Sequence, residues 1–400
     1  MINWDLLFAI IFYSLIILIF FWKRNKFDVQ NKIFVMYKTK LGLKLMDKLA
    51  KKFPKLLNFL GIMGIILGYL GMAFIFIILI KETFKFLTID GAVPPLAPVL
   101  PGIAIPGAPT LSFWHWIIAI FIVALVHEMA HGIMARVHKI QVKSSGVFFL
   151  GPIFGAFVEP NEKEMEKVSI KKQLSILAAG PFSNIIFGFI FLLIVTFGLA
   201  PAMGNMLEFK SITINQILEG YPMEKTNIEV PFKIISVDNH KIDDESDFIE
   251  LVSALKPGTE MTLETDKGSY SIVTVADPNN STKGFIGISG FEIEQQIKPE
   301  VIAKYGLFWP NALQWISLLT LWLFLINIGV GLFNLLPLGP VDGGKMFYLT
   351  NLAIFKDKIK AQKIFGFISF LLLVIILINL YPYISKLIIF LLKPVGMFIS

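Results

Sequence analysis

Residues 111–137 read LSFWHWIIAIFIVALVHEMAHGIMARV, an apolar run that carries a His-Glu-x-x-His motif near its end. His127 and His131 are four residues apart, so on a helix they share one face, about 6 Å apart along the axis. In this arrangement the two imidazoles can bind one Zn²⁺, while Glu128 faces the attacking water. The stretch therefore predicts hydrolytic zinc chemistry on a helix that crosses a membrane.

The whole chain has the composition of a polytopic membrane protein. Of its 400 residues, 55% are hydrophobic, 16% are charged and 38 are Phe, and the mean hydropathy is +0.71. The net charge of +7 comes from lysines that cluster beside apolar spans. This placement indicates a positive-inside topology and contact with the lipid bilayer rather than with nucleic acid. Because the chain has no Cys, disulfides and thiolate metal ligands are excluded.

Six apolar stretches are long enough to span a membrane. The first lacks a basic region before it and a cleavage site after it, so we interpret it as a retained anchor. Lys23–Leu56 then carries eleven Lys or Arg against two Asp, which predicts a cytoplasmic loop and an outside N-terminus. Within this loop, Lys38–Phe53 has helical spacing and is expected to lie on lipid headgroups. The six stretches are Trp4–Trp22, Leu57–Ile80, Leu111–Val137, Gln173–Leu199, Leu307–Phe333 and Ile364–Leu380.

Three segments interrupt the helical pattern. Val93–Pro109 is apolar but broken by Pro and Gly, which predicts an outer loop or a re-entrant piece shielded by protein. Ser144–Pro160 is too short to span, and it favours either a membrane-dipping hairpin beside the metal site or an ordinary packed loop. Tyr381-Pro382 is expected to end the sixth span and leave an interfacial tail.

Residues 205–300 have a different composition, with eight Lys against seventeen Asp or Glu. Short alternating runs predict strands, Glu245–Leu255 predicts one amphipathic helix, and Asp266-Lys267-Gly268 predicts a hairpin turn. This part is expected to be a folded, soluble α/β domain that lies outside by the count of spans. The strand-like runs are Ser211–Leu218, Lys233–Val237, Glu260–Thr265, Ser269–Val275 and Gly284–Ile288.

A catalytic zinc needs a third protein ligand and an open position for water. Asp342 is the best candidate because it lies at the inner end of a span, in a Gly/Pro bend that frees its side chain; Glu159 is the weaker competitor. Asn334 before the bend and Asn184 beside Pro181 are polar side chains at membrane depth, which suggests that both helices face the site. For Asn184, a helix kink with interhelical hydrogen bonding is the alternative.

Together these motifs resemble those of the site-2 proteases, a family of intramembrane zinc metalloproteases. The family combines a His-Glu-x-x-His helix, a Gly-Pro-x-x-Asn helix and an Asn-x-x-Pro-x-Pro-x-x-Asp-Gly segment, matched here by His127–His131, Gly180–Asn184 and Asn334–Gly343. One position departs from the pattern, because Gly339 stands where the family usually has its second Pro. The resemblance covers residues 110–350.

The resemblance implies a role for each matched residue. His127, His131 and Asp342 would bind Zn²⁺, and Glu128 would act as the catalytic base. Asn334 and Asn184 would contact the substrate backbone or the developing oxyanion.

The acidic domain resembles a PDZ domain, which members of this family often carry as an insertion. Glu219–Asn227 is similar to the family's Gly-Ser-Pro-Ala turn, whereas Val230–Ile234 lacks the usual Gly-Asp. The predicted fold is a polytopic α-helical membrane protein of about six spans with one inserted α/β PDZ-like domain. The predicted parts are an N-terminal hairpin at 1–110, the first half of the metalloprotease core at 111–204, the PDZ-like domain at 205–300 and the second half of the core at 301–400.

The predicted function is zinc-dependent cleavage of a peptide bond within or near the transmembrane segment of a membrane-protein substrate. We expect a multi-pass protein of the cell membrane with its zinc site toward the cytoplasm. Two alternatives are a non-catalytic zinc-binding scaffold that recruits partners through the PDZ-like domain, and an ion transporter that uses the same ligands. Glu128 and all ligands are present, which disfavours the scaffold, and a transporter gives Glu128 no clear purpose. No sequence signal bears on the oligomeric state.

Overall fold

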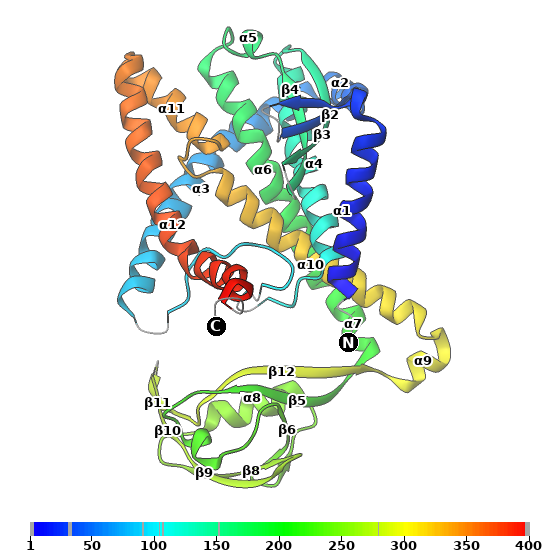
Figure 1. Ribbon diagram of the computed structural model, residues 1–400, viewed down its shortest axis with the longest axis vertical. Coiled ribbons are helices and arrows are strands. Elements are labelled where there is room, and N and C mark those ends of the chain that lie inside the picture. The colour runs from blue at the N-terminus through cyan, green and yellow to red at the C-terminus, as the bar shows by residue number, and fades with distance from the viewer. Residues whose placement is uncertain are drawn as a thin grey trace. The chain divides into compact units, whose positions relative to one another are not determined.

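The computed structural model describes residues 4–30, 34–89, 92–103, 105, 108–150, 153–278 and 280–396. Six helices in these ranges are long and apolar enough to cross a membrane, which confirms the predicted polytopic architecture. The spans lie in α1 (Trp4–Trp22), α3 (Pro54–Thr88), α4 (Phe113–Val137), α6 (Ile170–Ile194, continued to Met206), α10 (Phe308–Asn334) and α12 (Lys358–Gly396) (Figure 1).

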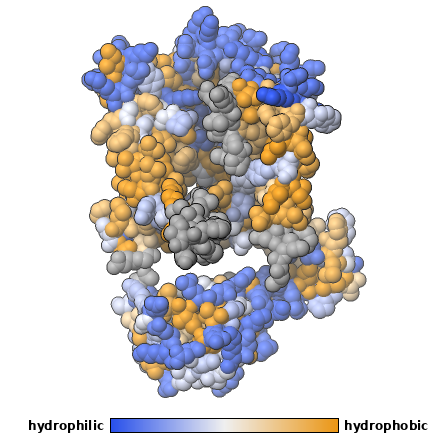
Figure 2. Space-filling view, viewed as in Figure 1, coloured by the Kyte–Doolittle hydropathy of each residue, from blue (hydrophilic) through white to orange (hydrophobic). Residues whose placement is uncertain are grey.

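The chain divides into two compact units. The membrane unit comprises Met1–Val195 and Leu318–Ser400, and the inserted unit comprises Thr196–Ser317. Hydrophobic residues cover the flank of the membrane unit in Figure 2, while its end beside α2 (Leu43–Lys52) and α5 (Glu162–Met165) is hydrophilic. An apolar flank is the surface that a lipid bilayer requires.

Helix α6 is the centre of the membrane unit, because it contacts α3, α4 and α11 (Asp342–Phe355). Small residues permit these close approaches: Ala178 is fully buried, and a Cβ placed on Gly61 of α3 would lie 3.3 Å from Cβ of Ser175 in α6. The helix is therefore enclosed on several sides, so its polar residues face protein rather than lipid.

A four-stranded antiparallel sheet lies beside α4 (Figure 1). Its strands follow the order β1 (Asp28–Gln30), β2 (Phe34–Thr39), β3 (Val142–Leu150) and β4 (Ile153–Pro160). The described residues of Ser144–Pro160 form a β-hairpin, and its position in the membrane stays a prediction. Among the described strands β4 pairs only with β3, so its other edge is open.

The basic segment Lys23–Leu56 differs from its predicted structure. Part of the expected headgroup helix Lys38–Phe53 is strand β2, in which Tyr37 pairs with Val147 and Thr39 with Ser145. Only Leu43–Lys52 is helical, and its Met46 is fully buried against α4 rather than placed in lipid. The contiguous apolar residues Phe34–Tyr37 of β2 gain a partner strand, β3, that lies far away in the sequence, and this pairing decides their conformation.

The other two interrupting segments give opposite outcomes. Between Val93 and Pro109 the described residues form no regular helix or strand, as predicted, while residues 104, 106 and 107 lie outside the described set. The expectation that Tyr381-Pro382 ends the sixth helix is wrong, since α12 runs from Lys358 to Gly396. Proline removes one backbone hydrogen bond, and long apolar helices tolerate this loss when the freed carbonyl is satisfied locally.

The inserted unit contains the predicted α/β domain. Its main sheet has the order β12-β5-β6-β8-β9, with β7 pairing with β6, and Phe248 of α8 (Glu245–Ala254) packs into its core. The predicted strand Gly284–Ile288 is wrong in part, because Gly287 turns the chain at φ +87° between two strands. The strands are β5 (Leu207–Ile217), β6 (Phe232–Val237), β7 (His240–Lys241), β8 (Glu260–Thr265), β9 (Gly268–Val273), β10 (Val275–Asp277), β11 (Asn280–Phe285) and β12 (Ile288–Ile297).

Candidate metal centre

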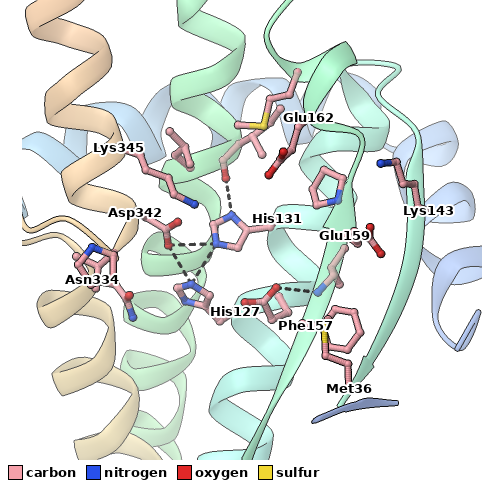
Figure 3. Close-up of a pocket in the computed structure, with 18 residues that line it drawn as sticks. Met36, His127, His131, Lys143, Phe157, Glu159, Glu162, Asn334, Asp342 and Lys345 are labelled. Atoms are coloured by element: carbon pink, nitrogen blue, oxygen red, sulfur yellow. Dashed lines mark hydrogen bonds and ion pairs between the residues drawn. The ribbon is translucent and has the colours of Figure 1, made fainter. Parts of the chain in front are cut away.

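Three donor atoms from distant parts of the chain converge in the membrane unit (Figure 3). The Nε2 atoms of His127 and His131 are 3.1 Å apart, and Oδ2 of Asp342 lies 3.1 Å from the first and 3.2 Å from the second. Tetrahedral ligands about 2.0–2.2 Å from a zinc ion are separated by roughly 3.4 Å. The triangle of donors therefore fits one zinc ion, and its residue types fit a catalytic site with an open fourth position.

Helix α6 leaves room for the two imidazoles because it has glycine where they meet it. A Cβ placed on Gly180 would lie 2.3 Å from Nε2 of His131 and 2.6 Å from Nε2 of His127. Any side chain at this position would occupy the space of the ligand atoms. The Gly of the Gly-Pro-x-x-Asn segment is thus a steric requirement of the site.

Asp342 is held in place by a tight fold of the backbone before it. The chain turns at Leu335–Val341, and Asp342 is the first residue of α11. A Cβ on Gly343 would lie 2.3 Å from the Leu335 carbonyl carbon, and one on Gly344 would lie 1.9 Å from the Leu338 oxygen. The two glycines let the turn pack directly on the start of α11, which directs the Asp342 carboxylate at α4.

The second nitrogen of each imidazole is also occupied. Nδ1 of His131 lies 2.7 Å from the carbonyl oxygen of Ile176, which can only accept, so Nδ1 carries the proton and Nε2 is free to bind a metal. Nδ1 of His127 lies 3.1 Å from the amide nitrogen of Asn184, while the buried Oδ1 of Asn184 has no partner. With the amide O and N of Asn184 exchanged by a rotation of the side chain, Oδ1 accepts from the Nδ1–H of His127. Both rings then present Nε2 to one point.

Asn184 therefore has a different place from the one expected. It was predicted to contact the substrate, but its side chain is 0% exposed and lies behind His127 instead of lining the cavity. Asn334 does line the cavity, with its amide donating to the Val330 carbonyl at 3.0 Å. Glu159, the competing ligand, lines the cavity as well, but its carboxylate accepts a hydrogen bond from Ser144 at 2.6 Å and it is absent from the donor triangle.

The donor triangle opens into a cavity of about 580 Å³. Glu128 lines it and accepts a hydrogen bond from the backbone N–H of Val158 in β4, at 2.9 Å. The charged side chains of Lys143, Glu162 and Lys345 also line this cavity, and in Figure 3 Lys345 lies beside Asp342 while Lys143 lies on the opposite side of the view. Lys345 was missed by the sequence reasoning, although a basic residue one helical turn after Asp342 was a visible signal. These groups give the cavity a polar, water-accessible lining.

Comparisons with known proteins agree with this site. The model of Peptidase family M50 matches residues 115–378. An uncharacterized protein of Methanocaldococcus jannaschii is 31% identical over 340 residues, which cover 83% of this chain and 80% of the relative. A protein of Clostridium perfringens, named as a candidate zinc metalloprotease, is 24% identical over 60% of this chain and 88% of its own length.

The chain is also similar to a solved structure over part of its length. The PDZ domain of an SdrC-like protein from Listeria innocua aligns at 18% identity, covering 20% of this chain and 92% of that one, with a TM-score of 0.18. The family match includes both the His-Glu-x-x-His helix and the Asn334–Gly343 segment, and it extends over more than half of the 400 residues. The chain belongs to Peptidase family M50, the site-2 protease family of zinc metalloproteases.

Proposed function

We propose that this protein is a zinc endopeptidase that cleaves a peptide bond within or near the transmembrane segment of a membrane-anchored substrate. The observation that carries the proposal is the meeting of His127, His131 and Asp342 in one cavity with Glu128, among helices long and apolar enough to cross a membrane. A site among such helices lies at the depth of the membrane, where it can meet the transmembrane segment of another protein.

The two histidines and Asp342 would hold the metal. When bound there, zinc polarises the scissile carbonyl and lowers the pKa of the attacking water. The protein's own part is to fix both imidazoles with their protonated Nδ1 atoms turned away, through Ile176 and Asn184. Ligands that are oriented in this way need no rearrangement during the reaction.

Glu128 would carry the proton. It takes one proton from water as the water oxygen bonds to the carbonyl carbon, and it delivers that proton to the leaving amine as the C–N bond breaks. Glu128 directly follows His127 in the sequence and lines the same cavity as the donor triangle, which supports this role. The net reaction is the addition of one water across one peptide bond.

The substrate would bind as an extended strand on β4. The Val158 N–H points away from β3, because it donates to Glu128, so the outer edge of β4 presents backbone groups at the site. A transmembrane helix has all its amides bonded internally and must unwind before cleavage, and pairing with a sheet edge replaces the bonds it loses. Asn334, at the cavity wall, would add a hydrogen bond to the unwound backbone.

The sidedness follows from the charge distribution. We place the N-terminus and the inserted domain outside and the zinc site toward the cytoplasm, because Lys23–Leu56 is strongly basic. Water would enter past the charged residues at the cavity mouth. An outside domain could exclude substrates whose outer portion has not yet been trimmed.

The test is cleavage of a transmembrane substrate in proteoliposomes by the wild type and by Glu128→Ala. We expect cleavage by the wild type only, with zinc bound at one equivalent in both, since Glu128 is not a ligand. Cleavage that persists in Glu128→Ala contradicts the mechanism. Bound zinc with no cleavage of any tested segment supports the scaffold, and zinc flux across the vesicle supports the transporter.

A further inference from the structure

A second, apolar cavity adjoins the metal centre. It has a volume of about 290 Å³ and lies between α4 and one face of the four-stranded sheet. On the helix side it is lined by Phe121, Leu125 and Met129, successive residues of one helix face. On the sheet side it is lined by the cross-strand sets Tyr37, Val147 and Ala156, and Thr39, Ser145 and Val158.

This apolar cavity and the metal cavity share three lining residues. Glu128, Phe157 and Val158 line both of them. Glu128 therefore forms part of the wall between the two spaces, with its carboxylate bonded to the N–H of Val158 at 2.9 Å. A substrate group that approaches Glu128 from the metal cavity is therefore next to the apolar cavity.

The hydroxyls of Thr39 and Ser145, which line the apolar cavity, already donate to backbone carbonyls. The Thr39 hydroxyl donates to the Ser145 carbonyl at 3.1 Å, and the Ser145 hydroxyl donates to the Leu41 carbonyl at 2.5 Å. A hydrocarbon side chain can enter such a space without leaving a buried polar group unpaired. A polar side chain would find no free partner among these two hydroxyls and would lose its hydration.

The geometry of the sheet directs a substrate side chain toward this space. Side chains on neighbouring strands that face the same side of a sheet lie roughly 4.5–5.5 Å apart. A strand that pairs with the open edge of β4 near Val158 thus places every second side chain on the face that carries Ala156 and Val158. That face is the wall of the apolar cavity, and Val158 is bonded to the catalytic base.

We propose that this apolar cavity is a specificity subsite, which receives a large apolar side chain next to the scissile bond of the substrate. The inference rests on the proposed function and adds the substrate class: segments with Leu-sized or Phe-sized side chains at one position beside the cut. Segments with Ala or Gly there leave the cavity unfilled and are poor substrates.

Three variants of the full-length protein test the subsite. Ala156→Leu fills the cavity from the sheet side, and Leu125→Ala enlarges it from the helix side; neither residue is a metal donor. Val35→Leu is the matched control, because Val35 lines a separate apolar cavity of about 300 Å³ against α1. The two test variants change the volume in opposite directions, so a preference that moves in opposite directions cannot come from general destabilisation.

The first readout is binding, measured by titration of the zinc-loaded protein in detergent with peptide hydroxamates that differ only by Ala, Leu or Phe beside the chelating group. We expect the wild type and Val35→Leu to bind the Leu or Phe peptide at least about ten-fold more tightly than the Ala peptide. Ala156→Leu should lose this preference, and Leu125→Ala should shift it toward Phe. The same order of preference in all four proteins overturns the proposal.

The second readout is cleavage of transmembrane substrates with the same substitutions at each residue beside the cut. Selective binding without any cleavage supports the subsite and contradicts the proposed function. Cleavage without side-chain preference, together with non-selective binding, supports the proposed function and refutes the subsite. If the subsite and the proposed function are both correct, Ala156→Leu loses the side-chain preference in binding and also in cleavage. Val35→Leu keeps both preferences.

Discussion

The side-chain amide of Asn184 lies 3.1 Å from Nδ1 of His127, and both side chains are buried. The remaining amide atom of Asn184 has no other partner in the described structure. Asn184 thus contacts His127, a candidate metal ligand, on the side of the ring opposite the donor triangle, and we expect this contact to orient the ring. Partners of this kind are known to affect metal affinity without touching the metal.

Removing this contact should weaken zinc binding. We expect Asn184→Ala to lower the zinc affinity by about 10–100-fold, measured by competition with a chelator of known affinity. Asn327→Ala is the control, because Asn327 is equally buried but donates to the Leu323 carbonyl of its own helix. Equal zinc affinity in the wild type and Asn184→Ala would show that the contact does not orient His127.

Gly180 should tolerate no side chain. A Cβ at this position would lie 2.3 Å from the His131 Nε2 atom, so Gly180→Ala should displace the ligand and abolish zinc binding. Gly329→Ala is the matched variant in a neighbouring helix, since a Cβ there meets nothing within 4 Å. It should retain zinc and gain up to about 1 kcal/mol of stability from the better helix former. Metal analysis of both purified variants checks this, and zinc in Gly180→Ala would contradict the donor geometry.

The third zinc ligand can be identified by comparing two carboxylates of the same cavity. Asp342→Ala should lose zinc, because Oδ2 of Asp342 lies within 3.2 Å of both imidazole Nε2 atoms. Glu159→Ala should retain zinc, because the Glu159 carboxylate is bonded to Ser144 instead. Elemental analysis of the two purified proteins decides between them, and the opposite pattern would reassign the ligand.

The inserted domain should lose stability in acid through Glu294. A hydrogen bond from Lys233, with others from Thr213 and Ser211, lowers the pKa of Glu294 from 4.5 to about 2. Since this folded-state pKa lies below the unfolded value, the stabilisation is present above pH 4.5 and is lost as the pH falls toward 2. We expect Glu294→Gln to flatten the pH dependence of urea unfolding of residues 205–300 in this window.

A neighbouring carboxylate provides the control for this measurement. Glu292 accepts from Asn215 at 3.5 Å and is exposed, so Glu292→Gln should keep the wild-type pH profile. The ion pair between Lys233 and Glu294 is short, with 2.7 Å between Lys233 Nζ and a Glu294 carboxylate oxygen. If both variants change the profile equally, the effect comes from net charge rather than from this contact.

Local patterns were enough to predict the centre of the site. His127 and His131 are related by the helical repeat alone, and the Gly/Pro bend before Asp342 marks irregular backbone at the end of a span. The six apolar stretches and the acidic α/β domain follow from composition and periodicity in the same way. The helical repeat, the bend and each apolar stretch lie within about 30 residues of sequence, which is the range where such reasoning works.

The remaining features depend on pairing between distant segments. Strand β2 exists because Thr39 meets Ser145, 106 residues later, and no local pattern distinguishes it from the start of a helix. The burial of Asn184 behind His127 depends on which face of α6 meets α4. Helix α12 continues through Pro382. Proline, which breaks helices in water-soluble proteins, is thus tolerated in this long apolar helix, where no competing structure is available.

The separation of the metal donors has a consequence for biosynthesis. Asp342 follows His127 by 215 residues. A nascent chain that has inserted α1, α3, α4 and α6 and completed the inserted α/β domain therefore holds only two of the three donors. The donor triangle is therefore complete only once the chain has been synthesised as far as Asp342. On the proposed function, a shorter nascent chain would be inert toward the membrane spans around it.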